Sequence, residues 1–523
     1  MRLALRRILL LAVPTTVVAL VSLRPLRADD DGAAAEPVAA TPGVISGRVR
    51  FKGEAPPPGP IHAHHDPEVC GKGGVIADET LVVAVDGGLA NVVVVLDGVP
   101  AGAPEPGGAA ALDQRSCAFV PHVQTVTHGA TLSITSNDPV LHNVHAFLGQ
   151  RTAFNLAIPV AGKVVARRLG EPGILRIRCD SGHTWMSAFI AVVPHRWHAT
   201  SAADGSFTIG DVPPGTYTVR AWHERLGAVQ QSVTVTAGGT ITTSLTFELP
   251  TDPTAPAPTD PTGGLRDALR ETRTAVDALD QQRRADERDR LAGEGRPLFR
   301  KYCATCHGQA GDGRGPSARF TSTPPRDFTR GTYKFRMTPA GSPPTREDLV
   351  RTISVGVRGT HMPAWSGRLT SSQIRTLARY LTTRSEVFWT GTALPAPIDI
   401  PAEPALDDAS VARGRALYEK MGCFACHGLR GTGDGPAASA LRDDWGRLVP
   451  PADLTRGVYK GGVGGAVVYR AISTGLGGTP MPSFDPAMTP SERWDLAHYV
   501  VSLARGRTVV DYLLDPVGRS TPP

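Results

Sequence analysis

The sequence predicts a multidomain protein whose N-terminal part is all-β and whose C-terminal part is all-α. Its 523 residues exceed what one hydrophobic core holds, so several domains are expected. Short β-rich runs separated by Gly and Pro recur between residues 43 and 249, where no helical periodicity of useful length occurs. Further along, a segment that closes with a helix-like pattern occurs twice. These observations divide the chain into a β part and a duplicated helical part.

The composition fits soluble globular domains and excludes one class of partner. Apolar residues make up 41% of the chain and charged residues 20%, which is typical of folded domains. The net charge of +6 is small for this length, and no run of Lys and Arg forms a basic footprint. Nucleic acid is therefore not an expected partner.

Residues 1–31 have the pattern of a signal peptide or membrane anchor. Arg2, Arg6 and Arg7 precede an apolar run over residues 8–23, which is short for a membrane span. No small-x-small cleavage site follows, so an uncleaved anchor remains the alternative to a removed signal. In either case the rest of the chain is expected outside the cytoplasm, in a bacterial periplasm.

The β-rich runs predict one or two antiparallel β-sandwiches. The expected strands cover residues 44–49, 81–85, 91–96, 131–135, 174–178, 189–193 and 232–236. Several histidines fall in this part. His62, His64 and His65 belong to a Pro-rich loop and are expected to be solvated. A structural role is expected for His122, His128, His195, His198 and His223.

Two turn motifs near the end of the β part indicate a specific module. Asp204-Gly-Ser-Phe207 and Pro213-Pro-Gly-Thr-Tyr217 resemble the D-G-x-F and P-P-G-x-Y turns of the carboxypeptidase-regulatory-like β-sandwich. The resemblance covers residues 195–249 and implies a structural spacer rather than a chemical site. The opening strand, around residues 45–49, is a candidate for completing the same sheet.

A spacer and a helix are expected between the two halves. Residues 250–264 are rich in Pro and predict a semi-rigid linker. Residues 265–291 carry a sparse apolar stripe among many charges, which predicts a solvated helix packed at the edge of the helical part. A dimeric coiled coil is the alternative for this helix.

Two copies of the motif Cys-x-x-Cys-His, at residues 303–307 and 423–427, carry the chemistry of the helical part. This motif attaches c-type haem: both thiols add to the haem vinyl groups, and the histidine binds the iron. A redox dithiol or half of a zinc site would not explain the histidine after both pairs. The predicted haem-binding residues are Cys303, Cys306, His307, Cys423, Cys426 and His427.

The duplication indicates the second iron ligand of each haem. Residues 359–365 (Gly-Thr-His-Met-Pro-Ala-Trp) match residues 478–484 (Gly-Thr-Pro-Met-Pro-Ser-Phe), so Met362 and Met481 occupy corresponding positions. His361 competes with Met362, but Pro480 stands at its counterpart. Histidine and methionine together raise the reduction potential and close the sixth coordination position.

Each copy of the repeat is expected to end in a helix, at residues 371–381 and 490–503. With the haem motifs and the methionines, this resembles class I cytochrome c. The resemblance covers residues 293–505 and implies two tandem cytochrome c domains, at 292–386 and 405–510, which transfer electrons.

Three cysteines remain once the two haems are assigned: Cys70, Cys117 and Cys179. In an oxidising compartment two of them are expected to pair. Cys179, His183 and Met186 follow one another at close spacing, and a thiolate, an imidazole and a weak thioether are ligands of a blue-copper site. If Cys179 binds metal, Cys70 and Cys117 remain to form the disulfide.

The Cys179 segment, with His142 upstream, resembles a plastocyanin-like cupredoxin over residues 115–194, within a predicted domain at 43–194. The resemblance implies a mononuclear copper held by His142, Cys179, His183 and Met186. His145 is the alternative to His142, and the two would point to different faces of a strand. The Cys-x-x-x-His-x-x-Met loop is closer to the binuclear loop of cytochrome oxidase subunit II, but Leu175 stands where that family has its other cysteine. A copper-free cupredoxin-like fold with a buried Cys179 is the alternative.

The predicted function is electron transfer by a periplasmic protein with two c-type haems and one copper. No residue is assigned a catalytic role. The expected partners are redox proteins such as a terminal oxidase, a reductase or a dehydrogenase. The alternative is a haem or copper enzyme acting on peroxide, nitrite or nitric oxide, which would require an open coordination position. The predicted methionine ligands argue against it.

Overall fold

The computed structural model describes residues 41–72, 74–99, 107–249, 275–390 and 394–504. All of them belong to one compact unit. The predicted export segment, 1–31, and the predicted linker, 250–264, lie outside the described residues. None of the described helices is both long enough and apolar enough to cross a membrane.

Seven strands form one β-sandwich, which we call the split sandwich. Its three-stranded sheet has the order β13-β1-β16, and its four-stranded sheet has the order β12-β2-β14-β15. Its strands are β1 (Gly43–Phe51), β2 (Val93–Asp97), β12 (His198–Thr200), β13 (Ser206–Val212), β14 (Gly215–His223), β15 (Gly227–Val235) and β16 (Thr240–Phe247). Ile45, Val94 and Val219 are fully buried between the two sheets. Alternating apolar residues thus give both sheets a common core.

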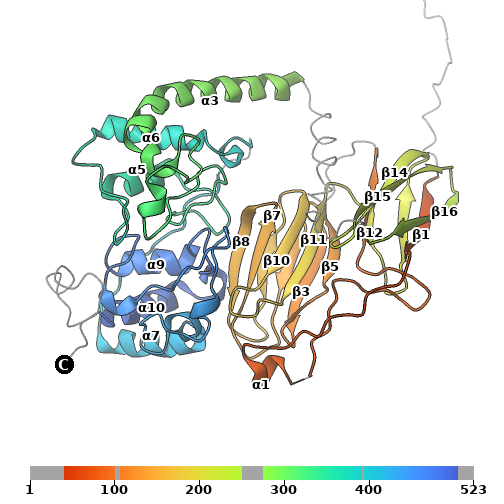
Figure 1. The fold of residues 1–523 in the computed structure, drawn as a ribbon, viewed down its shortest axis with the longest axis horizontal. Helices are drawn as coiled ribbons and strands as arrows, with labels where there is room; N and C mark the ends of the chain where they lie inside the picture. The colour runs from red at the N-terminus through yellow and green to blue at the C-terminus, as the bar shows by residue number, and fades with distance from the viewer. Residues whose placement is uncertain (1–40, 73, 100–106, 250–274, 391–393, 505–523) are drawn as a thin grey trace, which may run out of the picture. The chain divides into compact units, whose positions relative to one another are not determined.

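Nine strands form a second β-sandwich, the inserted sandwich. The order in one sheet is β5-β11-β10-β7-β8 (Figure 1). The order in the other sheet is β4-β3-β6-β9. Its strands are β3 (Ala109–Arg115), β4 (Ala118–Val120), β5 (Val123–Thr127), β6 (Thr131–Ile134), β7 (His142–Leu148), β8 (Arg151–Ile158), β9 (Val165–Arg168), β10 (Gly173–Arg178) and β11 (Ser187–Val193). Leu132, Val144 and Ile177 are buried in its core.

The inserted sandwich interrupts the split sandwich in the sequence. The chain leaves β2 for β3 and returns from β11 to β12, which pairs with β2. β1 pairs with both β13 and β16, and β2 pairs with β14. The strands therefore divide differently from the predicted ranges 43–194 and 195–249. β1 completes the later domain, for which the opening strand was a candidate, and β2 joins it as well, because the apolar faces of both strands join its core.

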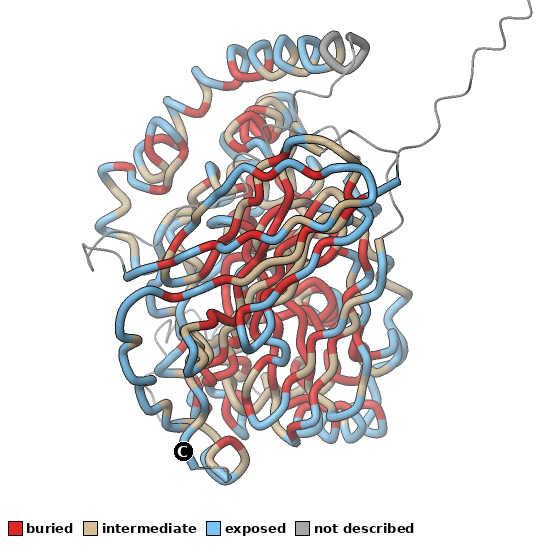
Figure 2. Tube along the Cα trace, turned by 90° about the vertical axis from the view of Figure 1, so that its right-hand side faces the viewer, coloured by how far each residue is buried: buried red, intermediate tan, exposed pale blue. Residues whose placement is uncertain are grey.

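Some strands differ from the sequence expectation for identifiable reasons. Residues 81–85 form no strand and make only an isolated bridge from Val83 to Leu89. β7 was not expected because all seven of its residues are buried, so it lacks the alternation that marks a half-exposed strand. Figure 2 shows how buried residues fill the interior of the protein.

The helical part contains two successive sets of helices. The first set is α3 (Ala275–Tyr302), α4 (Ala304–His307), α5 (Arg346–Val355) and α6 (Ser371–Thr382). The second set is α7 (Asp408–Lys420), α8 (Phe424–His427), α9 (Gly465–Thr474) and α10 (Pro490–Ser502). The helices predicted to close the repeats are present as α6 and α10. The helix predicted to end at residue 291 instead continues to Tyr302, next to the first haem motif.

Glycines allow close helix crossings in both sets. A Cβ on Gly295 of α3 would lie 2.3 Å from the Cβ of Tyr380 on α6. A Cβ on Gly414 of α7 would lie 2.0 Å from the carbonyl oxygen of Asp495 on α10. Both distances are below van der Waals contact, so each crossing requires a residue without a side chain. These crossings hold the helix that precedes each haem motif against the helix that closes its set.

Candidate metal and haem centres

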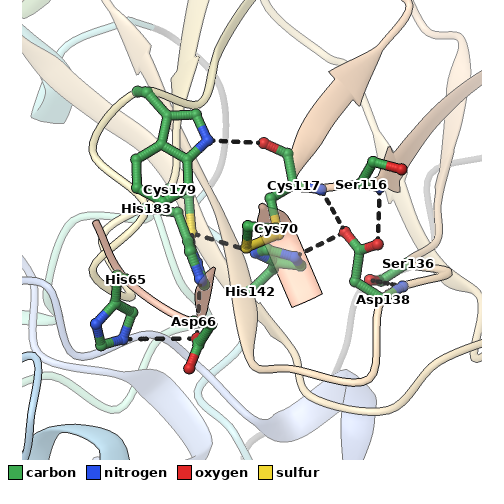
Figure 3. Close-up of a disulfide and its surroundings, with 11 residues drawn as sticks. His65, Asp66, Cys70, Ser116, Cys117, Ser136, Asp138, His142, Cys179 and His183 are labelled. Carbon is green, nitrogen blue, oxygen red and sulfur yellow. Dashed lines mark hydrogen bonds and ion pairs between the residues drawn. A yellow bond between two sulfur atoms is a disulfide. The ribbon is translucent and has the colours of Figure 1, made fainter. Parts of the chain in front are cut away.

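Three predicted metal ligands converge in the inserted sandwich. His142 begins β7, Cys179 follows β10, and His183 lies in the loop that leads to β11. The Sγ atom of Cys179 lies 3.8 Å from Nδ1 of His142 and 3.8 Å from Nδ1 of His183 (Figure 3). All three side chains are buried, with exposures of 0 to 2%. One sulfur and two imidazole nitrogens thus face a common point and fit a soft or borderline metal ion.

A carboxylate holds the far side of each imidazole ring. The Nε2 atom of His142 lies 3.0 Å from Oδ2 of Asp138, and that of His183 lies 3.0 Å from Oδ2 of Asp66. When Nε2 donates a proton to a carboxylate, Nδ1 keeps its lone pair for a metal. The carboxylates therefore select the tautomer that directs Nδ1 toward Cys179.

Asp138 is itself fixed by the backbone. Its carboxylate accepts the N–H groups of Ser116, at 2.7 Å, and Cys117, at 2.8 Å. Burial favours its neutral form, but the hydrogen bonds from His142 and the backbone outweigh burial and hold the pKa of Asp138 below its usual value. The carboxylate stays ionised and can orient the ring.

Asn143 organises the loop between β10 and β11, residues 179–186, which we call the Cys179 loop. Its Oδ1 atom accepts the backbone N–H of Asp180 at 2.6 Å and the hydroxyl of Ser181 at 3.2 Å. The Sγ atom of Cys179 lies 3.4 Å from the same oxygen. The amide of Asn143 donates to Asn155 of β8 at 2.8 Å. One side chain thus joins the Cys179 loop to two strands.

Of the other two residues considered as copper ligands, Met186 lies in the Cys179 loop, whereas the His145 side chain makes its contacts elsewhere. Met186 is buried in the same loop, where its N–H donates to the carbonyl of His183 and its carbonyl accepts the N–H of Cys179. His145 points elsewhere: its Nδ1 lies 2.5 Å from Asp180 and its Nε2 lies 3.1 Å from Oγ1 of Thr152. Of the two candidate histidines, His142 is the one beside Cys179.

Cys70 and Cys117 form a disulfide beside this site. The bond joins the short helix α1 (Pro67–Cys70) to the turn that supports Asp138. Trp185 donates its indole N–H to the carbonyl of Cys117 at 3.0 Å. The disulfide therefore fastens the segment that precedes α1, including Asp66, over the Cys179 loop.

The structure corrects the expectation that His65 is a solvated loop residue. Its ring lies 5.2 Å from that of His183, and its Nε2 is 3.6 Å from Asp66. Burial lowers the pKa of His65, although the charge of Asp66 acts in the opposite direction. His62 and His64 are exposed, as expected. His65 is thus part of the cover over His183.

The first Cys-x-x-Cys-His motif lines a cavity of about 190 Å³. The Nδ1 atom of His307 lies 2.9 Å from the carbonyl oxygen of Arg326, so it donates there and leaves Nε2 for iron. Burial lowers the pKa of His307, which keeps the ring neutral. Among the residues that line the cavity are Cys303, Cys306, His307 and Met362. This set fits a haem bound by two thioethers, a histidine and a methionine.

The second motif repeats the same local geometry. The Nδ1 atom of His427 lies 3.0 Å from the carbonyl oxygen of Ala452. The carbonyl of Met481 accepts an N–H from Leu476 at 3.1 Å, as that of Met362 accepts one from Val357 at 3.0 Å. These residues fit a haem in the same way as the first set.

The second haem motif also lies within electrostatic reach of the Cys179 loop. Burial raises the pKa of the Cys426 thiol to about 11, and the negative charges of Cys179 and Asp180 add to the rise. The packing shows the same proximity: a Cβ on Gly422, directly before Cys423, would lie 2.8 Å from the Cβ of Leu141, which directly precedes His142.

Three cationic residues line the cavity of the first haem centre: Arg326, Lys334 and Lys460. Burial lowers the pKa of Lys334 to about 7, and the charges of Arg326 and Lys460 add to this effect. Such cations suit the carboxylate groups that a haem carries on its edge.

Sequence reasoning missed Asp66, Asp138 and Asn143. Asp138 precedes His142 by four residues, a spacing that could have suggested a pair. Asp66 is 117 residues from His183, and no local pattern connects the two. Supporting residues of this kind are fixed by the folded chain rather than by a motif.

Three family models match parts of the chain. The Cytochrome c model matches residues 411–504, and the model of the cbb3-type cytochrome c oxidase subunit III matches residues 290–381. The model of the carboxypeptidase regulatory-like domain matches residues 176–250.

Individual relatives cover smaller shares. The Cbb3-type cytochrome c oxidase subunit FixP of Azorhizobium caulinodans is 25% identical over 221 residues, which are 41% of this chain and 60% of that protein. This chain thus spans less than two thirds of that relative. A chain of the Kuenenia stuttgartiensis reducing HAO-like protein complex is 43% identical over 40% of this chain and 96% of its own, with a TM-score of 0.40. A purple cupredoxin from Nitrosopumilus maritimus is 20% identical over 16% of this chain and 98% of its own, with a TM-score of 0.15.

The fold class predicted from the sequence, an all-β part followed by an all-α part with cytochrome c domains, is confirmed. The resemblance to a carboxypeptidase-regulatory-like domain is also confirmed. The cytochrome c matches identify a haem protein of the electron-transfer type.

Proposed function

We propose that this chain is an exported, periplasmic electron-transfer protein with two covalently bound c-type haems and one mononuclear copper. It relays single electrons between redox partners. The observation that carries the proposal is the convergence of His142, Cys179 and His183 in a chain that also holds two haem motifs.

His142, Cys179 and His183 would hold the copper, with the thioether of Met186 as a weaker ligand. Bound there, copper supplies a one-electron couple. The protein contributes the geometry around it. Asp138 and Asp66 keep each Nδ1 directed at the site, and the complete burial of both imidazoles excludes water from it.

The two haems would be held by corresponding residues. Cys303 and Cys306 would form the thioethers of the first, with His307 and Met362 as iron ligands. The second would use Cys423, Cys426, His427 and Met481. Haem ligated in this way supplies a one-electron couple of raised potential. The backbone carbonyls bonded to both histidines fix the rings, and the two methionines would close the sixth position.

Redox proteins are the proposed partners. The curated relative is by name a subunit of a cbb3-type cytochrome c oxidase, and one similar chain belongs to an HAO-like complex. A terminal oxidase, a reductase or a dehydrogenase is therefore the proposed type of partner. Residues 1–31 would export the chain and, if uncleaved, anchor it.

Elemental and haem analysis of the purified full-length protein tests the proposal. Two covalent haems and one copper per chain are expected, together with low-spin spectra that show a methionine-to-iron band. Cys179→Ser should lose copper and keep both haems, whereas Thr184→Ala, an exposed neighbour in the same loop, should keep all three. Copper retained by Cys179→Ser, or high-spin haem that binds cyanide or peroxide readily, would contradict the proposal and favour an enzyme.

A further inference from the structure

The second helical set carries an extra residue directly before its haem motif. In the first set the N–H of Cys303 bonds to the carbonyl of Phe299, four residues earlier, at 2.8 Å. In the second set the N–H of Cys423 bonds to Tyr418, five residues earlier, at 3.0 Å. The additional residue is Gly422, whose φ of 70° lies in the left-handed region that favours glycine.

Gly422 lies against the inserted sandwich. A Cβ at this position would be 2.8 Å from the Cβ of Leu141. Leu141 directly precedes His142, the proposed copper ligand. The extra glycine thus lets the backbone before the second haem motif approach the residue before that ligand.

A longer insertion follows the second haem motif. Pro324 comes 18 positions after Cys306, whereas Pro450 comes 24 positions after Cys426, a difference of six. The Pro-Pro pairs correspond, since each pair stands directly before the residue whose carbonyl accepts a hydrogen bond from Nδ1 of the haem-motif histidine. The six additional residues lie within the loop at 441–449.

This loop inserts a carboxylate into the inserted sandwich. The side chain of Asp444 is 1% exposed, and its Oδ2 accepts a hydrogen bond from Oγ1 of Thr152 at 2.6 Å. Its Oδ1 lies 3.7 Å from Nε2 of His145 and 3.8 Å from Nη2 of Arg178. His145 in turn bonds to Asp180, the residue after Cys179. A chain of buried polar contacts therefore connects the insertion with the Cys179 loop.

The segment around Met481 in the second set, residues 478–484, also joins the inserted sandwich. Ser483, two residues after Met481, pairs with β8: its N–H donates to the carbonyl of Asn155 at 3.0 Å, and its carbonyl accepts the N–H of Ala157 at 2.9 Å. The first helical set meets β8 at Gly341, where a Cβ would overlap the carbonyl of Ala153. That glycine lies outside both the haem motif and the methionine segment of its set.

We infer that Gly422 and the loop at 441–449 dock the second cytochrome domain onto the inserted sandwich beside the Cys179 loop, which makes the second haem the direct intrachain redox partner of the copper. This inference rests on the proposed function and adds the pairing of the centres. One electron is exchanged: Cu(I) becomes Cu(II) as Fe(III) becomes Fe(II), with no bond or proton transferred. Asp444 acts as a positioning residue.

Rapid one-electron reduction of the full-length, copper-loaded protein tests the pairing. A phase independent of protein concentration should report exchange between copper and haem. Asp444→Ala should slow this phase at least tenfold, with copper and haem contents unchanged. Asp408→Asn, an exposed acid on α7 of the same domain, is the matched control and should leave the rate unchanged. An unchanged rate in Asp444→Ala would overturn the inference.

Ligand variants identify the haem that takes part. Met481→His and Met362→His should each lower the potential of one haem and mark it spectrally. We expect the copper-dependent phase to change with Met481→His and to persist with Met362→His; the reverse pattern overturns the pairing. Failure of the proposed function is distinguishable, because it appears in the metal analysis as missing copper or haem. A protein with all three centres but the reverse kinetic pattern contradicts only the pairing.

Discussion

Asp66 holds the buried ring of His183 from outside the Cys179 loop. Its Oδ2 lies 3.0 Å from Nε2 of an imidazole that is fully buried. The hydrogen bond from His183 lowers the pKa of Asp66, although burial acts in the opposite direction, so the carboxylate stays ionised. The proposed copper site thus depends on a residue 117 positions away in the sequence.

Replacing Asp66 should weaken metal binding without removing a ligand. In Asp66→Ala the Nε2 of His183 loses its acceptor, and Nδ1 is no longer kept free for metal. Supporting partners of this kind are typically worth about 10- to 100-fold in affinity. Copper titration of the variant should show a loss in this range. His62→Ala, an exposed change in the same loop, should bind normally; equal affinity in both variants would contradict a role for Asp66.

Removing the disulfide should destabilise the inserted sandwich. Cys70 and Cys117 are 47 positions apart, and closing a loop of this length restricts the unfolded chain by about 4 kcal/mol. The double variant Cys70→Ser/Cys117→Ser should lose free energy of unfolding of this order in a denaturant titration. Because Asp66 is also released, copper affinity should fall as well. A variant with unchanged stability would show that packing alone holds α1 in place.

Acid should destabilise the split sandwich through His223. Burial lowers the pKa of this residue to about 4, and the charges of Arg225 and His122 add to the effect. The unfolded chain takes up a proton near pH 6.5, whereas the folded protein does so only near pH 4. The free energy of unfolding should therefore fall as pH drops from 6.5 to 4, by up to about 3 kcal/mol.

Thermal unfolding measured across this pH range checks the effect. His223→Gln should flatten the pH dependence, since the amide does not titrate. His62→Gln, at an exposed position, should leave the slope as it is. A slope that survives in His223→Gln would assign the acid sensitivity to other groups, such as His195 and His198, whose pKa values burial also lowers to about 4.

Removing Met362 should open the first haem. Without its thioether, Met362→Ala leaves the sixth iron position for water or an added ligand, and the reduction potential should fall. Visible spectra and cyanide titration should show high-spin haem that binds ligand in one of the two domains. Met337→Ala provides the control, because this methionine has no counterpart in the second repeat. Cyanide binding that is unchanged in Met362→Ala would point to another ligand, with His361 as the nearest candidate.

The haem motifs could be predicted from sequence because their residues are local. Five consecutive residues mark each motif, and the duplication suggests Met362 and Met481 as second ligands, which stays a prediction. The cluster of candidate copper ligands was partly predictable, since Cys179, His183 and Met186 share one loop. The choice between His142 and His145 required the fold: the two lie on one strand, and only the ring of His142 reaches Cys179.

The other parts of the fold could not be predicted because they depend on contacts between residues far apart in the sequence. The opening strand was a candidate for the later sandwich, but β2 was not: its partners β12 and β14 lie more than 100 positions further along the chain, and no local signal reports them. β7 escaped detection because both of its faces are buried. The burial of Asp444 was equally hidden, since a charged residue in a loop is ordinarily solvated.

The interruption of one β-sandwich by another has a consequence for the order in which the chain folds. The strands of the inserted sandwich occupy one continuous stretch, residues 109–193, so this domain can assemble as soon as that stretch has emerged. β1 and β2 emerge earlier but must wait for β13 to β16, which bury their apolar faces. Closing that long loop is slow unless its ends are brought together first. The folded inserted sandwich brings the ends together, because β2 directly precedes it in the sequence and β12, which pairs with β2, directly follows it.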